Sequence, residues 1–353
     1  MTRRQIAIIS ALGAALILAY LLFWPVPIDP EAWTPPKAPK LEGIYAPNDR
    51  LASVELLGKG IGIGPEDVAL DSQGRIYGGM VDGKIMRLSP GKDAELFADT
   101  GGRPAGLGFD SDGNLIVADG YKGLLSITPE GEIIILSTEA EGLSFGLTDD
   151  LDIADDGIIY FTDASYKFGA QDYMLDLMEH RPNGRFLSYD PDTGSTEVLL
   201  DGLYFANGVA VSPDQSFVLV AETGRYRVLR YWLAGPKKGE FEVFVDNLPG
   251  FPDGISTGTE VFWLALVSPR DPAVDFAFSH PIFRKVLVRL PSRILTPPRY
   301  GFVLGLDQNG RVVFNLQDPS GSYAHITSVQ EEDGMLYLGS FSEGSIGRLP
   351  VTQ

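Results

Sequence analysis

At 353 residues, with 44% apolar and 21% charged residues, the chain has the composition of a folded globular protein with ample material for a core. Its formal net charge of -19 argues against a nucleic-acid partner, because phosphate binding needs clustered lysine and arginine. The sequence contains no cysteine, which excludes disulfide bridges and thiolate metal sites.

The first element is an apolar N-terminal segment. Arg3 and Arg4 precede an uncharged run at residues 6–24, which is long enough to cross a bilayer as a helix. The basic flank predicts a cytoplasmic N-terminus and a body outside the membrane. A cleaved signal peptide is the alternative, but no small-residue cleavage site precedes Trp24, which favours a signal-anchor helix over residues 1–24. The chain also lacks Asn-x-Ser/Thr sequons, so a single-pass protein of a bacterial inner membrane, facing the periplasm, fits best.

The second element is a proline-rich stretch over residues 25–44. We expect a stiff, extended spacer that holds the body off the membrane. The remainder, residues 45–353, is predicted to be a single domain. The prolines of the spacer are Pro25, Pro27, Pro30, Pro35, Pro36 and Pro39.

Six internal repeats follow the spacer. Most consist of an apolar strand, an Asp/Gly turn and a second strand rich in β-branched and aromatic residues. Their starts lie 39, 44, 58, 46 and 74 residues apart, and the shorter spacings match a four-stranded propeller blade. The pattern predicts an all-β, six-bladed β-propeller with insertions near 164–185 and 268–299, closed by an outer strand at 53–57. The repeats begin at Glu66, Ala105, Asp149, Asn207, Asp253 and Thr327.

The first positions of the repeats form a polar column. Positions two and four residues later share the strand face of that first position and are mostly apolar, so this face is predicted to be buried. Burying carboxylates around a common channel is unfavourable unless a cation compensates. The oxygen donors favour calcium or magnesium over zinc or copper. Hydrogen bonding to turn backbones is the alternative, but four donors in register favour a metal. The four are Glu66, Asp149, Asn207 and Asp253.

This column resembles that of the calcium-dependent six-bladed propeller hydrolases, namely the gluconolactonase/regucalcin, paraoxonase and diisopropylfluorophosphatase groups. The sequences at 158–165 (IIYFTDAS), 217–255 and 329–341 (VQEEDGMLYLGSF) resemble the strictosidine synthase-like branch, which includes adipocyte plasma membrane-associated protein. The resemblance covers residues 45–350 and implies an N-terminal anchor. It also implies Ca²⁺ ligands at Glu66, Asp149, Asn207 and Asp253, with Asp149 replacing the asparagine usual in the hydrolases.

The resemblance implies hydrolysis of an ester or lactone, with the cation polarising the carbonyl. Asp253 is expected to act as base or nucleophile, with ligation alone as the alternative. His325 is the second catalytic candidate, as a proton shuttle, and a structural role is its alternative. Two departures favour a rival hypothesis, in which calcium is structural and the propeller is a non-catalytic binding module. Ala105 replaces the proposed catalytic histidine of paraoxonases, and Thr327 replaces the glutamate of strictosidine synthases, which disfavours alkaloid condensation.

Two further features lie near the expected mouth. Phe205 and Phe251 each precede a predicted ligand by two residues and are expected to form an apolar lip, although packing between blades explains them equally well. Residues 282–299 predict a short basic amphipathic helix. This helix is expected to lie over the channel mouth as a lid, to rest on anionic lipid, or to pack on the acidic propeller. Its basic residues are Arg284, Lys285, Arg289, Arg293 and Arg299.

Overall fold

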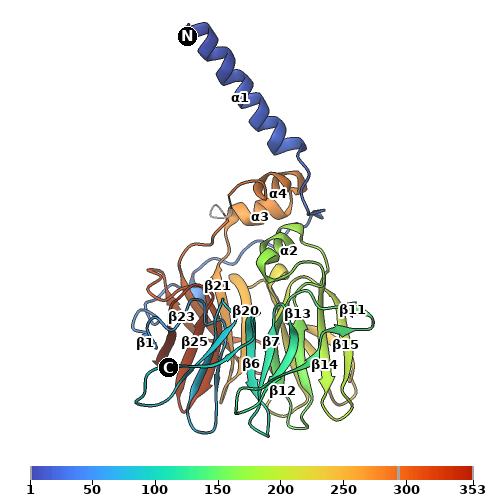
Figure 1. Cartoon of the computed structure of the whole chain (residues 1–353), viewed down its shortest axis with the longest axis vertical. Helices are drawn as coiled ribbons and strands as arrows, with labels where there is room; N and C mark the ends of the chain where they lie inside the picture. Colours follow the sequence, from blue (N-terminus) through green and yellow to red (C-terminus); the bar gives the residue numbers. More distant parts are fainter. Residues whose placement is uncertain (1, 292–294, 352–353) are drawn as a thin grey trace.

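Six four-stranded antiparallel sheets form the body of the protein (Figure 1). The computed structural model describes residues 2–291 and 295–351. The sheets follow one another in the sequence, and their first strands β2, β6, β12, β16, β20 and β24 contact one another in a ring. The predicted all-β, six-bladed β-propeller is therefore confirmed.

The strands of the first three blades share one order, from the channel outward. Blade 1 contains β2 (Val68–Leu70), β3 (Ile76–Gly79), β4 (Lys84–Leu88) and β5 (Glu95–Asp99). Blade 2 contains β6 (Pro104–Phe109), β7 (Leu115–Asp119), β8 (Gly123–Ile127) and β9 (Ile133–Ser137). Blade 3 contains β12 (Thr148–Ile153), β13 (Ile159–Asp163), β14 (Gly184–Asp190) and β15 (Ser195–Leu203). A two-stranded ribbon, β10 (Glu139–Ala140) and β11 (Leu143–Ser144), precedes blade 3.

Blades 4 and 5 keep this order, and blade 6 takes its outer strand from the beginning of the propeller domain. Blade 4 contains β16 (Ala206–Val211), β17 (Phe217–Glu222), β18 (Arg227–Trp232) and β19 (Phe241–Val245). Blade 5 contains β20 (Gly250–Thr257), β21 (Phe262–Pro269), β22 (Gly301–Leu306) and β23 (Val312–Asp318). Blade 6 contains β24 (Ile326–Glu332), β25 (Met335–Ser340), β26 (Ile346–Pro350) and β1 (Glu55–Leu57).

The pairing of β1 with β26 closes the ring. Glu55 lies opposite Arg348 in the ladder, and their side chains form an ion pair at 2.7 Å. Because the closing strand comes from the far end of the domain, the last blade is hydrogen-bonded to the start of the propeller and leaves no open edge between the two ends. This strand falls within the predicted range 53–57.

Asp/Gly turns connect paired strands because aspartate and glycine satisfy two needs of a tight turn. The Asp71 carboxylate accepts hydrogen bonds from the backbone N–H groups of Gln73 and Arg75, at 2.9 and 3.0 Å. Gly74 has a φ of 69°, in the left-handed region that favours glycine. Asp110 accepts the equivalent pair of bonds at 3.0 and 2.8 Å. These turns set the length of each hairpin and hence the place where each inner strand begins.

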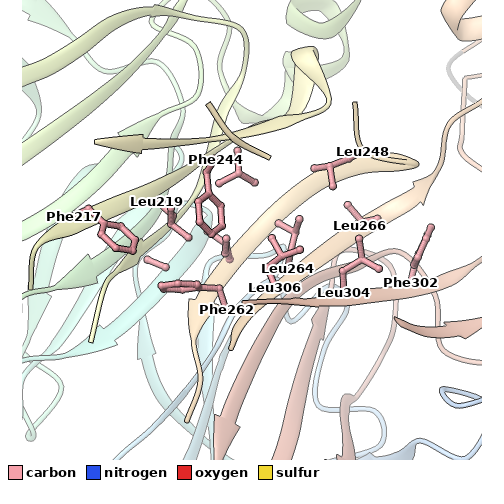
Figure 2. Close-up of a cluster of buried hydrophobic side chains, with 13 residues drawn as sticks. Phe217, Leu219, Phe244, Leu248, Phe262, Leu264, Leu266, Phe302, Leu304 and Leu306 are labelled. Atoms are coloured by element: carbon pink, nitrogen blue, oxygen red, sulfur yellow. The ribbon is translucent and has the colours of Figure 1, made fainter. Parts of the chain in front are cut away.

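The core consists of apolar clusters between neighbouring blades. Figure 2 shows the cluster between blades 4 and 5, where Leu219, Phe262 and Leu264 lie among side chains from both blades. Truncating one such buried leucine to alanine removes about 2–5 kcal/mol of stability. This packing fixes neighbouring blades and therefore the positions of the inner-strand ends around the channel.

The longest helix, α1 (Arg3–Phe23), projects away from the propeller (Figure 1). Thr2 caps its first turn, and its apolar side chains are mostly exposed. The window Arg3–Leu21 is long and apolar enough to cross a membrane. A signal sequence can have the same length and apolar composition, so α1 is a candidate membrane span.

Three short helices cover one face of the propeller, on the side from which α1 projects (Figure 1). They occupy the two predicted insertions. The second insertion forms two helices rather than the single one expected, and residues 292–294, including Arg293, lie outside the described residues. The helices are α2 (Tyr173–Glu179), α3 (Pro272–Phe278) and α4 (Pro281–Leu287), and the 3₁₀ turns are η1 (Gly43–Tyr45), η2 (Ala170–Asp172) and η3 (Thr223–Arg225).

The proline-rich segment lies against this helical face instead of standing away from it. The Trp33 backbone N–H donates to the Phe278 carbonyl at 3.0 Å, and the Trp33 ring stacks on His180 with centroids 4.6 Å apart. Ile28 is buried against α2. The Arg270 guanidinium donates to the Pro36 carbonyl at 2.7 Å. Residues 25–42 contain no helix or strand, and they fasten α1 to the propeller rather than separating the two.

Candidate functional site

A cavity of about 620 Å³ lies where the inner strands begin, beneath α2, α3 and α4. A second cavity, of about 480 Å³, lies among the strands of blades 3 and 4 and contains none of the predicted site residues. The larger cavity has a floor of polar side chains at the channel and mostly apolar walls. Residues of its walls include Leu147, Leu177, Phe205, Phe251, Val267, Phe278 and Phe341.

All four predicted ligands line this one cavity. Glu66 lies just before β2, and Asp149, Asn207 and Asp253 lie near the starts of β12, β16 and β20. The structure thus brings together, from four blades, side chains that are up to 187 residues apart (253 − 66) in the sequence.

Irregular strand pairing directs three of these side chains. The ladder to the second strand shifts register around Asp149, around Asn207 and around Asp253. Bulges of this kind re-aim a side chain and are frequent beside active sites. A Cβ on Gly208 would lie 2.4 Å from the carbonyl oxygen of Asp253, so the close approach of β16 and β20 requires glycine there. The Asn-Gly and Asp-Gly pairs are the sequence signal of this arrangement.

Two of the carboxyl groups are held in an environment that disfavours their charge. Burial raises the pKa of Asp149 to about 7, with the Arg103 charge opposing and the Asp163 charge adding to the rise. Burial also raises the pKa of Asp253 well above its usual range, and the neighbouring Asp149 and Asp150 charges raise it further. Such a group of mutually repelling carboxyls favours either protonation or a cation.

Glu66, by contrast, already has a cationic partner. The Arg103 guanidinium forms an ion pair with the Glu66 carboxylate and donates to the Gly64 carbonyl at 3.3 Å. Arg103 also lines the cavity and is buried, and its backbone N–H donates to Asp119 at 2.9 Å. Sequence reasoning missed Arg103 because it precedes the column position of its blade, Ala105, by two residues.

The four predicted ligands are oxygen donors of the kind that a hard divalent cation binds. Carboxylate and amide oxygens are the ligands that calcium prefers. Within residues 2–291 and 295–351, no group of three or more Asp, Glu, His or Cys side chains is arranged to hold a metal. One of the three carboxylates, Glu66, is paired with Arg103. Calcium therefore stays a prediction, supported by the shared cavity and the repulsion between Asp149 and Asp253.

Hydroxyl and carboxyl side chains join neighbouring blades to each other around the floor. The Thr327 hydroxyl donates to the Glu66 carbonyl at 2.6 Å and so joins blade 6 to blade 1. The Thr223 hydroxyl donates to the Pro252 carbonyl at 2.6 Å, beside Asp253. The Asp150 carboxylate accepts from the Val209 N–H at 2.9 Å. The sixth position of the column is thus a structural link that positions the backbone of Glu66.

His325 is not among the described residues that line the cavity. Its ring stacks on Phe341, which does line the cavity, with centroids 4.8 Å apart. Both ring nitrogens have partners, the Ser342 hydroxyl at 2.7 Å and the Pro297 carbonyl at 3.2 Å. Burial lowers the pKa of this imidazole, which favours its neutral form. In this structure His325 packs against Phe341, a residue of the cavity wall, and does not itself line the cavity.

The helices α2 and α4 complete the apolar walls. Met174 and Leu177 reach the cavity from α2, and Phe283 and Leu287 reach it from α4. Phe205 and Phe251, the expected apolar lip, also line it. The cavity therefore combines an acidic floor with walls suited to an apolar ligand.

Arg284 differs from expectation because it is fully buried rather than part of an exposed basic face. Its guanidinium donates to the carbonyls of Met178 and Glu179 at 2.9 and 3.1 Å, which fixes α4 to α2. Arg289, two residues after the end of α4, donates to the Leu21 carbonyl at 2.8 Å and so joins this segment to the last turn of α1. These arginines satisfy helix-end carbonyls and fix the arrangement of the helices over the cavity.

Comparison with known proteins agrees with this architecture. The family model of strictosidine synthase matches residues 149–236, and the model for the N-terminal region of strictosidine synthase-like proteins matches residues 43–88. The chain is 35% identical over 374 residues to adipocyte plasma membrane-associated protein of Bos taurus, covering 98% of this chain and 90% of that protein. It is 37% identical over 322 residues to strictosidine synthase-like protein 6 of Arabidopsis thaliana, covering 86% and 84%.

Solved structures share the fold at low sequence identity. A gluconolactonase from Xanthomonas campestris superposes with a TM-score of 0.64 at 16% identity, over 93% of this chain and 98% of that one. A calcium-binding protein, regucalcin, from Agrobacterium tumefaciens gives a TM-score of 0.58 at 15% identity, over 84% and 90%. At these identities the likeness concerns the fold.

Proposed function

The chain belongs to the strictosidine synthase-like family that includes adipocyte plasma membrane-associated protein, and we propose that it is a membrane-anchored, calcium-dependent hydrolase of esters or lactones. One observation carries the proposal. Four oxygen donors, Glu66, Asp149, Asn207 and Asp253, share the floor of a single cavity whose walls are apolar. The lactonase and calcium-binding descriptions of the structural neighbours agree with it.

In this proposal, Glu66, Asp149, Asn207 and Asp253 hold the ion. When bound, calcium supplies polarisation of the substrate carbonyl and charge stabilisation for the oxyanion. Asp253 would accept a proton from the attacking water and return it to the alkoxide as the acyl C–O bond breaks, or would itself attack the carbonyl carbon, expel the alkoxide and form an anhydride that water then hydrolyses. Burial, with the Asp149 and Asp150 charges adding to it, raises the pKa of Asp253 in the metal-free floor, and a bound divalent cation would favour the deprotonated form that accepts a proton. His325 receives no direct role, because it lies outside the cavity lining.

The substrate class follows from the walls. Phe205 and Phe251 flank the floor, and residues of α2 and α4 enclose the space above it. The cavity volume of about 620 Å³ accommodates a ligand of drug-like size. We therefore expect hydrophobic acyl or aryl esters and apolar lactones to be better substrates than sugar lactones.

Membrane attachment through α1 is part of the proposal. In it the N-terminus is cytoplasmic, the propeller lies outside, and a bacterial inner membrane facing the periplasm is the setting. The helices α3 and α4 lie on the side from which α1 projects (Figure 1), and they carry the exposed Phe276 and Ile282, which are 53% and 75% accessible. We propose that this face, with the half-buried Lys285 as a basic group, touches the lipid surface and presents the cavity to apolar substrates.

A non-catalytic binding module with a structural calcium is the second candidate. It is favoured by Thr327, whose hydroxyl is committed to the Glu66 carbonyl, and by Ala105, which contributes no acid or base to the cavity it lines.

Hydrolysis assays on the full chain in detergent distinguish the two candidates. Phenyl acetate and a panel of lactones are supplied with calcium, with chelator, and with Asp253→Asn. Asp112→Asn, an exposed residue in the turn after β6, is the matched control. The hydrolase predicts turnover that needs calcium and falls at least about 100-fold in Asp253→Asn alone. Calcium-dependent stabilisation without turnover supports the binding module.

A further inference from the structure

Arg103 is a cation built into the floor of the cavity. Its side chain is 10% accessible and that of Glu66 is 22% accessible, so the ion pair between them is largely shielded from solvent. Burial lowers the pKa of the Arg103 guanidinium and the nearby Asp149 charge opposes that shift, and an arginine keeps its charge throughout the physiological pH range. Arg103 thus binds one oxygen of the Glu66 carboxylate, which is a predicted metal ligand.

The charges of the floor set the Arg103 guanidinium and a divalent metal ion in competition for Glu66. Glu66, Asp149 and Asp253 bring three carboxyl groups to the cavity, and Arg103 brings one positive charge. The carboxylate of Glu66 is committed to Arg103, whereas Asp149 and Asp253 repel each other. The Arg103 guanidinium engages Oε2 of Glu66, so a divalent ion that binds through this oxygen must displace the guanidinium, which cannot be removed by deprotonation.

We propose that Arg103 is an internal competitor of the divalent cation, so that calcium enters the floor by exchanging with the guanidinium at Glu66. This inference rests on the calcium site of the proposed function, and it adds Arg103 as a residue that sets the affinity of that site for calcium. Calcium binding then breaks the Arg103–Glu66 ion pair, and the observed affinity is lower than the oxygen donors alone provide. The opposing possibility is that Arg103 orients Glu66 for the metal, in which case its removal weakens binding.

Neutral substitutions of Arg103 separate these possibilities. Calorimetric titration of calcium into the full chain in detergent is carried out for wild type, Arg103→Met and Arg103→Gln. The glutamine keeps a donor for the Gly64 carbonyl, so it carries the test if the methionine variant does not fold. Arg87→Met is the matched control, because Arg87 forms an ion pair with Glu95 at 2.8 Å on outer strands, away from the cavity.

Exchange predicts that both neutral variants bind calcium at least about ten-fold more tightly than wild type, since a charge-assisted contact no longer competes. Arg87→Met is expected to match wild type. In a Glu66→Gln background the gain from Arg103→Met should disappear, because the contested carboxylate is gone.

The remaining outcomes are distinguishable. Equal or weaker binding in a folded neutral variant overturns the inference and leaves the calcium of the proposed function intact. No binding by wild type, together with binding by the neutral variants, supports the competitor and contradicts calcium dependence of the native chain. No binding by any of these proteins at millimolar calcium overturns both.

Discussion

Replacing Thr327 with valine removes one hydroxyl and keeps the shape of the side chain. That hydroxyl donates to the Glu66 carbonyl at 2.6 Å from a position only 2% accessible, so its loss leaves a carbonyl at the cavity floor without this donor. A lost bond of this kind destabilises a protein by about 1–2 kcal/mol. With an unfolding entropy of about 2.1 cal/mol/K per residue, a domain of this size should lose about 1.5–3 °C in Tm.

The same substitution should weaken calcium binding, because the backbone of a ligand loses its support. Groups that orient metal ligands contribute roughly ten-fold or more to affinity. Thr257→Val is the matched control: its hydroxyl donates to the Val211 carbonyl at 2.6 Å, also between blades, and Thr257 does not line the cavity. Thermal unfolding and calorimetry should show similar Tm losses for both variants but weaker calcium binding only for Thr327→Val. Unchanged affinity in Thr327→Val, or equal weakening in both, refutes the positioning role.

Two further predictions concern pH and the membrane. Burial raises the pKa of Asp149 to about 7 and those of Asp67 and Asp152 to about 6, so folding favours their protonated forms. In chelator, Tm should therefore fall as pH rises from about 4 to about 7, and calcium should reduce that loss at pH 8; a chelated Tm that climbs over this range contradicts the assignment. Because the chain has no native cysteine, a fluorophore on Ile282→Cys should be quenched by doxyl lipids in nanodiscs. The same probe on Ser111→Cys, in the turn at the opposite end of β6, should not, and equal quenching at both sites would sink the membrane-facing orientation.

The propeller was predictable because its information is local and repeated. Alternating strands and Asp/Gly turns, such as the one at Asp71, recur with a spacing that matches a propeller blade, and one strand at 53–57 remains to close the ring. The polar column was predictable for the same reason. Strand parity distinguishes Asp149, Asn207 and Asp253 from their apolar neighbours, and the fold brings equivalent positions to one channel.

The remaining features depend on contacts between distant segments. In the sequence Arg284 looks like part of a basic helix face, but in the structure it is buried and its guanidinium donates to the carbonyls of residues 178 and 179. Arg103 stands outside the column, and its pairing with Glu66 across 37 residues follows from the packing of blade 2 on blade 1. The proline content of the spacer indicates stiffness, whereas its attachment depends on Ile28 and Trp33 finding the helical face. His325 lies close to the column in sequence, yet the stacking on Phe341 places it outside the cavity lining.

The most direct test of the calcium-dependent hydrolase is a rate profile against free calcium. Phenyl acetate hydrolysis and calorimetric calcium binding are measured on the same preparation of the full chain. The calcium concentration for half-maximal rate is expected to coincide with the Kd, and chelator is expected to abolish turnover reversibly. A hydrolysis rate that is unchanged by chelator, while calcium binds with a measurable Kd, would contradict it.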